Sequence, residues 1–428
     1  MEVLRNPKRE DWTGLTQRPL FDLTQLFSVV QPILENVKQR GDVALFEYEE
    51  KFDKAQLTTL EVTPAEVEEA VALVEPALKE ALQVAHRNIA SFHEAQRPQS
   101  LVVETCPGIR CEQHTVAIEK VGLYVPGGTA PLLSTVLMLG IPAQIAGCRT
   151  VVLCTPPNAE GKINPAILYA ASLCGIDKIY KVGGAQAIAA MAYGTETVPA
   201  VHKIFGPGNQ YVMAAKQLVA LSQVAIDMPA GPSEVEVFCD ATCVPQFVAA
   251  DLLSQAEHGV DSQVILVCTN ESTLTEILEA LEEQLVNLPR KEIAEKALQN
   301  SKAILFDTVE QGVEFTNSYG PEHLILSVEG YRDLAPLMPH AGSIFLGNYS
   351  SESAGDYASG TNHTLPTKGW VRSYSSLSLS SFMRSYTVQE LTPEGVVAIG
   401  TAVETMADAE QLFAHKHAMT LRLQSLSK

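Results

Sequence analysis

The sequence predicts an α/β protein with two Rossmann-like parallel-sheet lobes, a helical N-terminal region and a small C-terminal tail. Short β-rich runs alternate with helical segments from about residue 118, and this alternation starts a second time near residue 234. Such alternation is typical of parallel sheets covered by helices. A chain of 428 residues is also too long for one compact core.

The expected elements follow this order. The first 100 residues are mainly helical, because Thr63 to Glu66 form a capping box and the later apolar residues recur at helical spacing. Strands of the first lobe are expected at 121–125, 150–154, 178–183 and 203–206. Strands of the second lobe are expected at 234–240, 262–268, 303–306, 324–328 and 341–347. A strand-like connection and two helices form the tail.

Composition excludes several classes of partner. The net charge of −20 argues against nucleic acid and against an anionic membrane surface. The N-terminus lacks the apolar run of a secretion signal, and the most apolar stretch, 131–147, is short for a membrane span. None of the eight cysteines forms a CxxC pair, so reduced thiols and a cytoplasmic location are expected.

Glycine-rich turns follow three strands of the first lobe, at 125–128, 183–186 and 206–209. None is a complete G-x-G-x-x-G fingerprint, and each by itself is adequately explained as a tight turn. Together, at consecutive strand ends of one sheet, they fit a crevice in which backbone N–H groups approach an anionic ligand.

Two polar pairs lie near the ends of predicted helices. Gln255 and His258 share a helix face because they are three residues apart, although a histidine in the last turn also complements the helix dipole. Glu322 and His323 sit between a helix and a strand. They offer two proton-transfer groups of different basicity, unless they form a solvated polar turn.

The segment 353–363 is small and polar, and it contains Asp356 and His363. Carboxylate and imidazole are common metal ligands, while a flexible linker is the alternative. His415 lies on the final helix, five residues after Glu410, where a solvated helix face is the simpler interpretation. The residues alone therefore indicate a two-lobed cytosolic α/β enzyme with a candidate metal site.

Taken together, these motifs make the sequence similar to the histidinol dehydrogenases from about residue 25 to the C-terminus. The segments that carry the resemblance are VGLYVPGGTAPLLSTVLMLGIPAQIAGC, GPGN, IDMPAGPSEV, DLLSQAEHG, GPEHL, AGDYASGTNH and AHKHAMTLR. The resemblance implies the last steps of histidine biosynthesis. In these steps L-histidinol is oxidised through L-histidinaldehyde to L-histidine, with one Zn²⁺ per subunit and two NAD molecules used in turn.

The resemblance also implies roles for individual residues. The expected zinc ligands are Gln255, His258, Asp356 and His415. Glu322 and His323 are expected to be the catalytic proton-transfer pair. Tyr124, Gln186 and Asn209 match cofactor contacts. The expected substrate contacts are Ser233, Gln255, His258, His323, Asp356, His363, Glu410 and His415.

The expected domain organisation follows from these roles. Residues 1–22 form an N-terminal arm, 121–234 an NAD-binding lobe, and 23–120 with 235–375 a zinc and substrate lobe. The tail, 376–428, is too small for its own core and is expected to complete the partner's site in a domain-swapped homodimer. Two other classes stay open, a zinc hydrolase with Glu322 as its base and a non-enzymatic solute-binding protein.

Overall fold

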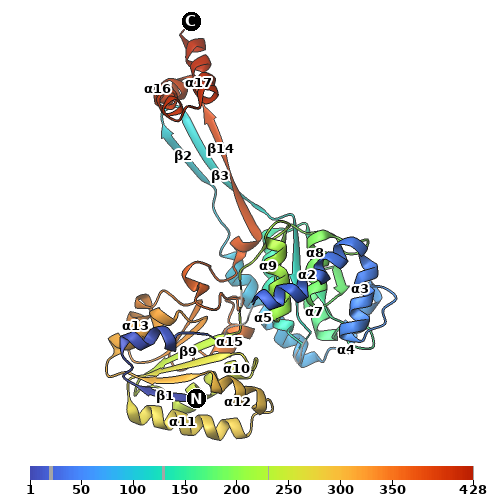
Figure 1. The fold of residues 1–428 in the computed structure, drawn as a ribbon, viewed down its shortest axis with the longest axis vertical. Helices are drawn as coiled ribbons and strands as arrows, with labels where there is room; N and C mark the ends of the chain where they lie inside the picture. The colour runs from blue at the N-terminus through green and yellow to red at the C-terminus, as the bar shows by residue number, and fades with distance from the viewer. Residues whose placement is uncertain (19–22, 128–130, 230, 428) are drawn as a thin grey trace.

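Two parallel-sheet lobes and a projecting arm make up the molecule (Figure 1). The structure is a computed structural model that describes residues 1–18, 23–127, 131–229 and 231–427. The predicted class, α/β with two Rossmann-like lobes, is confirmed by the two all-parallel sheets.

The first lobe contains a five-stranded sheet in the order β6-β5-β4-β7-β8. Its strands are β4 (Lys120–Tyr124), β5 (Thr150–Thr155), β6 (Lys178–Lys181), β7 (Lys203–Phe205) and β8 (Ala225–Ile226). The connecting helices are α6 (Leu133–Ala146), α7 (Pro165–Leu173), α8 (Gly184–Tyr193) and α9 (Gln210–Ala220). The strand order reverses between β4 and β7, and such a switch point leaves a crevice at the carboxyl ends of the strands.

The second lobe repeats this order in a six-stranded sheet, β1-β11-β10-β9-β12-β13. Its strands are β1 (Glu2–Arg5), β9 (Glu234–Cys239), β10 (Gln263–Cys268), β11 (Lys302–Leu305), β12 (His323–Ser327) and β13 (Ser343–Leu346). Its helices are α1 (Trp12–Leu15), α10 (Pro245–Ala256), α11 (Glu271–Val286), α12 (Lys291–Gln299), α13 (Val309–Tyr319), α14 (Tyr331–Leu334) and α15 (Glu352–Tyr357). The N-terminal strand β1, which the sequence analysis did not predict, closes one edge beside β11.

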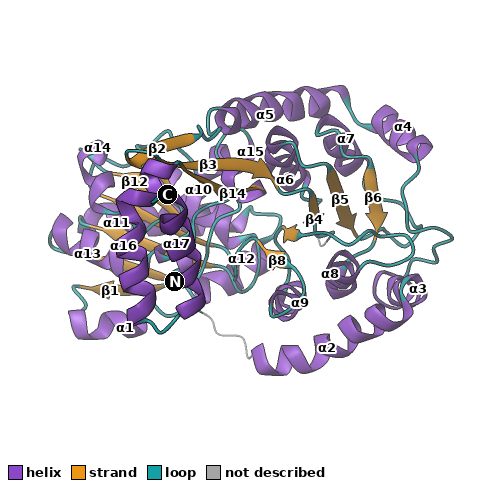
Figure 2. Cartoon of the chain, turned by 90° about the horizontal axis from the view of Figure 1, so that it is seen from above, coloured by secondary structure: helices purple, strands orange, loops and turns teal. Residues whose placement is uncertain are grey.

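The N-terminal helices belong to the first lobe in packing. These helices are α2 (Leu23–Arg40), α3 (Asp42–Tyr48), α4 (Pro64–Leu73) and α5 (Pro76–Glu94). Helix α2 packs on α8 and α9 on one face of the five-stranded sheet, and α4 and α5 pack on α7 and α6 on the other (Figure 2). The expected grouping of 23–120 with 235–375 is therefore wrong as a description of packing. The reason is that α6 is apolar on all sides and needs a second covering layer, which α5 provides.

The projecting arm joins two distant parts of the chain. The hairpin β2 (Leu101–Cys106) and β3 (Ile109–Ala117) pairs antiparallel with β14 (Met383–Leu391). Helices α16 (Pro393–Ala409) and α17 (Phe413–Leu426) pack on each other at the far end of this sheet, away from both lobes (Figure 1). The predicted strand and two helices of the tail are confirmed, but the hairpin that supports them was not predicted.

Local signals in the sequence account for several element boundaries. The Thr63–Glu66 capping box is present in both directions at the start of α4. Glycines at positive φ end α6 at Gly147 and α13 at Gly320. Across the described part of the chain, no helix combines the length and the apolar character needed to cross a membrane.

Candidate active site

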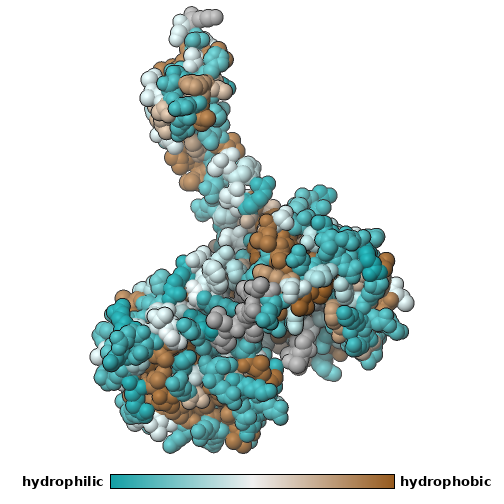
Figure 3. Space-filling model, viewed as in Figure 1, coloured by the Kyte–Doolittle hydropathy of each residue, from teal (hydrophilic) through white to brown (hydrophobic). Residues whose placement is uncertain are grey.

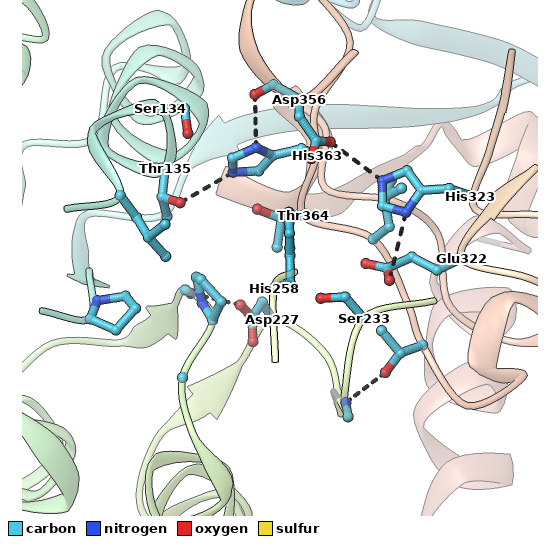
Figure 4. Close-up of a pocket in the computed structure, with 18 of the residues that line it drawn as sticks. Ser134, Thr135, Asp227, Ser233, His258, Glu322, His323, Asp356, His363 and Thr364 are labelled. Atoms are coloured by element: carbon cyan, nitrogen blue, oxygen red, sulfur yellow. Dashed lines mark hydrogen bonds and ion pairs between the residues drawn. The ribbon is translucent and has the colours of Figure 1, made fainter. Parts of the chain in front are cut away.

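A cavity of about 430 Å³ lies between the two lobes. One wall comes from the carboxyl ends of the five-stranded sheet, at Pro126 after β4, Gly206 after β7 and Asp227 after β8. The opposite wall comes from the amino ends of the six-stranded sheet, at Ser233 before β9 and at His323, which begins β12. The cavity thus joins two glycine turns of one sheet, at Gly127 and at Gly206 to Gly208, to Glu322 and His323 of the other. Figure 4 shows Glu322 and His323 among the side chains that line it.

Glu322 and His323 are held at the start of β12. Helix α13 ends at Gly320 with a φ of 67°, which turns the chain into the strand. Both side chains are buried, and both contact the backbone of Glu234: its N–H donates to Glu322 Oε2 (2.8 Å), and its carbonyl oxygen lies 3.2 Å from His323 Nδ1. A carbonyl only accepts, so Nδ1 carries a hydrogen and Nε2 faces Asp356 Oδ1 at 3.4 Å.

Several buried carboxylates surround the imidazole of His323. Burial raises the pKa of Glu322 to about 8. Burial also favours the neutral form of His323, but the carboxylates of Glu352, Glu322 and Asp356 outweigh it and raise the His323 pKa to about 10. Burial opposes ionisation of Asp356 as well, yet the adjacent His323 holds the Asp356 pKa below its usual value. The site therefore favours a proton on the imidazole.

Helix α15 brings a carboxylate that the sequence analysis missed. Glu352 and Asp356 are four residues apart on this helix, so they share a face, and with His323 they place three ligand atoms within 4.8 Å of one another. Glu352 Oε2, Asp356 Oδ1 and His323 Nε2 are buried without a hydrogen-bond partner. Such a group is suited to a cation. The E-x-x-x-D spacing was the available signal for Glu352.

Two other expected metal ligands, one on α10 and one just after it, lie near this group. Gln255 is fully buried between Glu352 and Glu234, and in the orientation that satisfies both neighbours its amide nitrogen donates to the Glu352 carboxylate while its oxygen accepts from the Glu234 N–H (3.0 Å). His258 follows the end of the helix and lines the open side of the cavity. The structure therefore places His258 and Asp356 on the cavity wall, while Gln255 is buried against Glu352 and does not line the cavity.

His363 lies between the lobes, on the cavity wall. Its Nδ1 donates to the carbonyl oxygen of Asp356 (2.9 Å), so its Nε2 accepts from the Thr135 hydroxyl (3.2 Å). Thr135 belongs to α6 of the first lobe, and Figure 4 shows His363 between that helix and His323. The sequence analysis did not identify Thr135, because nothing in the sequence pairs this threonine with a histidine 228 residues away.

The three expected cofactor residues lie at the glycine turns. Tyr124 is buried at the end of β4, and its hydroxyl accepts from the Gly184 N–H (3.0 Å). Gln186 is also buried and donates to Glu49 Oε1 (3.0 Å). Asn209 is exposed and caps α9. The three residues share one sheet edge but do not line the cavity, which the adjacent Gly206 to Gly208 turn reaches directly.

Glu410 and His415 stand apart from the site. Both are exposed at the far end of the projecting arm, and neither lines the cavity. Within one chain the cavity is therefore lined by the expected proton-transfer pair and by four other expected site residues, Ser233, His258, Asp356 and His363, but by none of those in the tail.

Comparisons with known proteins give a consistent result. The histidinol dehydrogenase family model matches residues 16–423. Histidinol dehydrogenase of Bacteroides fragilis is 58% identical over all of both chains, and that of Vibrio vulnificus is 54% identical over 97% of this chain and 96% of its own. The crystal structure of histidinol dehydrogenase from Elizabethkingia anophelis superposes with a TM-score of 0.98 at 54% identity, covering 100% of this chain and 99% of that one. The chain therefore belongs to the histidinol dehydrogenase family of oxidoreductases.

Proposed function

We propose that the protein oxidises L-histidinol through L-histidinaldehyde to L-histidine, with two hydride transfers to NAD and one Zn²⁺ per subunit. Family membership supports the reaction. The observation that carries the proposal is the cavity, because it connects glycine turns at the carboxyl edge of one parallel sheet to a Glu–His pair at the amino edge of the other. A dehydrogenase needs both a dinucleotide site and a proton acceptor.

His323 and Glu322 are the proposed catalytic residues. With Nδ1 bonded to the Glu234 carbonyl, His323 presents Nε2 to accept the hydroxyl proton of the substrate. The aldehyde then needs water before a second oxidation, and Glu322 is proposed to take a proton from that water. The carboxylates around His323 favour a proton on its imidazole. A bound divalent cation and the positively charged nicotinamide ring would offset the negative charge of these carboxylates and so lower the His323 pKa.

The residues present fit a divalent cation. We propose Gln255, His258 and Asp356 as its ligands from one chain. The buried oxygens of Asp356 and Glu352 that have no hydrogen-bond partner support this. Zinc at this position would orient the amine and imidazole of the substrate and fix its alcohol carbon. Ser233 and His363 on the cavity wall, and Glu410 from the tail, are the further proposed substrate contacts.

The glycine turns are proposed to hold NAD. At Gly206 φ is +122°, and a Cβ there would lie 2.1 Å from the Tyr124 carbonyl oxygen, so only glycine fits this turn. Tyr124 and Gln186 are both buried, and the Tyr124 hydroxyl accepts from the N–H of Gly184. They are therefore proposed to stabilise the turn at 183–186. Asn209 is the exposed member and the proposed direct contact.

We also propose a homodimer in which each tail completes the partner's site with His415 and Glu410. Support comes from the arm, which extends away from both lobes and exposes apolar side chains (Figures 1 and 3), among them Val397, Met406 and Phe413. A cytoplasmic location is proposed from the eight cysteines, all of which are free thiols.

One assay tests this function. Purified protein with L-histidinol and NAD should form two NADH per histidine, followed by absorbance at 340 nm. Exhaustive chelation should abolish turnover, and added Zn²⁺ should restore it. Full activity in metal-free protein would contradict the metal assignment, and absence of NADH formation would contradict the function itself.

A further inference from the structure

Arg18 forms a buried ion pair behind the catalytic pair, outside the cavity lining. Its side chain is 11% exposed, and its Nε and Nη2 donate to the two carboxylate oxygens of Glu234 at 3.1 and 2.8 Å. The guanidinium also lies over the ring of Tyr319, 3.7 Å from the centroid. This planar two-pronged contact is specific to arginine.

The same guanidinium also holds the turn before Glu322. Nη1 donates to the carbonyl oxygen of Tyr319 (2.9 Å), and Nη2 donates to that of Gly320 (3.1 Å). These carbonyls belong to the last residue of α13 and to the glycine that caps it, and a cation is favoured at a helix C-terminus. One side chain from the N-terminal arm therefore fixes both the start of β9 and the turn into β12.

Glu234 connects this ion pair to the chemistry. Its backbone N–H donates to Glu322, and its carbonyl oxygen accepts from His323. Its carboxylate is 1% exposed and accepts from Arg18 and from the Lys368 N–H (2.7 Å). Any displacement of Glu234 would thus move both proton-transfer groups together.

We infer that Arg18 is a positioning residue for Glu322 and His323, acting through Glu234 and the Gly320 carbonyl. The inference rests on the proposed function for its kinetic part. Misplacement of a reacting group by about 1 Å reduces rates by roughly 100-fold. Arg18 touches neither the cavity nor the glycine turns, so its effect belongs to the catalytic step and not to NAD binding.

The test compares Arg18→Met and Arg18→Lys with a matched control. Arg5→Met removes another two-pronged Arg–Glu pair, with Glu271, which is exposed on the surface. Arg18→Met should lower kcat by about 10- to 100-fold and leave the KM for NAD within about twofold. Arg18→Lys should recover part of this loss, because lysine keeps the charge but loses the fork. Arg5→Met should keep wild-type kinetics.

Double variants test whether Arg18 acts through Glu322 and His323. If Arg18 acts through the pair, the loss caused by Arg18→Met should shrink at least threefold in a Glu322→Gln background and in a His323→Asn background. Fully additive losses in both backgrounds would overturn the inference, as would an unchanged kcat in folded Arg18→Met. Because Arg18→Met strands a buried carboxylate, Arg18→Met/Glu234→Gln provides a variant without that charge, in which the same kcat loss is expected.

Hydrogen exchange separates this inference from the proposed function. In Arg18→Met, the amides of Gly320 and of residues 322–324 should exchange faster than in the wild type, while those of α11 should not. Unchanged exchange at Gly320 and at 322–324 would overturn the positioning role. If the wild type forms no NADH from L-histidinol, the proposed function fails, and the exchange result still decides whether Arg18 holds this turn.

Discussion

At the level of single residues, the backbone of Glu234 fixes the positions of Glu322 and His323. Glu322 and His323 are adjacent in sequence. Glu322 accepts a hydrogen bond from the backbone N–H of Glu234, and His323 donates one to the carbonyl oxygen of the same residue. This geometry gives each side chain a fixed direction and leaves His323 Nε2 for the cavity. Substitutions at these residues should therefore affect separate steps of the reaction.

Glu322→Gln should separate the two oxidations. A glutamine keeps the shape and still accepts from the Glu234 N–H, but it cannot take a proton from water. In a single-turnover experiment with excess NAD, the first NADH should form at close to the wild-type rate and the second at least about 100-fold more slowly. Equal slowing of the two phases would assign Glu322 a shared or structural role.

Glu49 gives a prediction about stability. It is buried beside Gln186 and Gly183, and burial, with the charge of Asp53, raises its pKa to about 8 from 4.5. The folded state therefore binds more protons than the unfolded state between these values, so stability must fall as pH rises through this range. Glu49→Gln should remove that fall, which is on the order of 1–3 kcal/mol.

Urea unfolding at pH 5.5 and pH 8.5 measures this effect. The difference in unfolding free energy between the two pH values should be smaller in Glu49→Gln than in the wild type. Glu50→Gln is the matched control, because Glu50 is the exposed neighbour and its replacement should leave the difference unchanged. The same pH dependence in Glu49→Gln and wild type would show that Glu49 is already ionised in the folded state.

At the scale of secondary-structure elements, the third glycine turn contains the residue that caps helix α9. Asn209 caps α9 by accepting from the N–H groups of Tyr211 (3.0 Å) and Val212 (3.1 Å). Asn209→Ala should lower stability by about 1 kcal/mol. It should also raise the KM for NAD several-fold and leave zinc content unchanged, because the proposed metal ligands lie in the other lobe and the tail.

Asn270→Ala is the control for this variant. Asn270 caps α11 in the second lobe by accepting from the Thr273 N–H (3.0 Å), so its loss has a similar stability cost and no reason to affect NAD. Thermal unfolding, steady-state kinetics and metal analysis should be measured on both. Loss of zinc in Asn209→Ala would contradict the separation between the dinucleotide turns and the metal site.

At the scale of the whole molecule, the projecting arm predicts subunit complementation. His323→Ala should disable the site through the body of the enzyme, and His415→Ala should disable it through the tail. If tails are exchanged in the dimer, a mixed dimer has one site with both defects and one intact site. Co-refolded variants should therefore recover activity in proportion to the fraction of mixed dimer, up to about half of the wild-type activity per dimer.

The assembly itself must be measured beside the activity. Analytical ultracentrifugation gives the oligomeric state, and differently tagged subunits allow the mixed dimer to be isolated. Isolated mixed dimer without activity would mean that each tail stays with its own body. Full activity of the His415→Ala homodimer would mean that His415 has no role at the site.

The sequence by itself determined the alternation of strands and helices, because the β-branched runs, the capping box at Thr63 and the helix-ending glycines are local signals. The family resemblance supplied the site residues. The structure places six of them on the wall of one cavity: Ser233, His258, Glu322, His323, Asp356 and His363. Only the tertiary structure decided that the N-terminal helices cover the first sheet, and that the hairpin at 101–117 supports the tail. It alone revealed that Arg18, Glu234 and Glu352 surround Glu322 and His323. These contacts join residues far apart in the chain, and burial of charge and apolar surface between such segments leaves no periodic pattern in a single sequence.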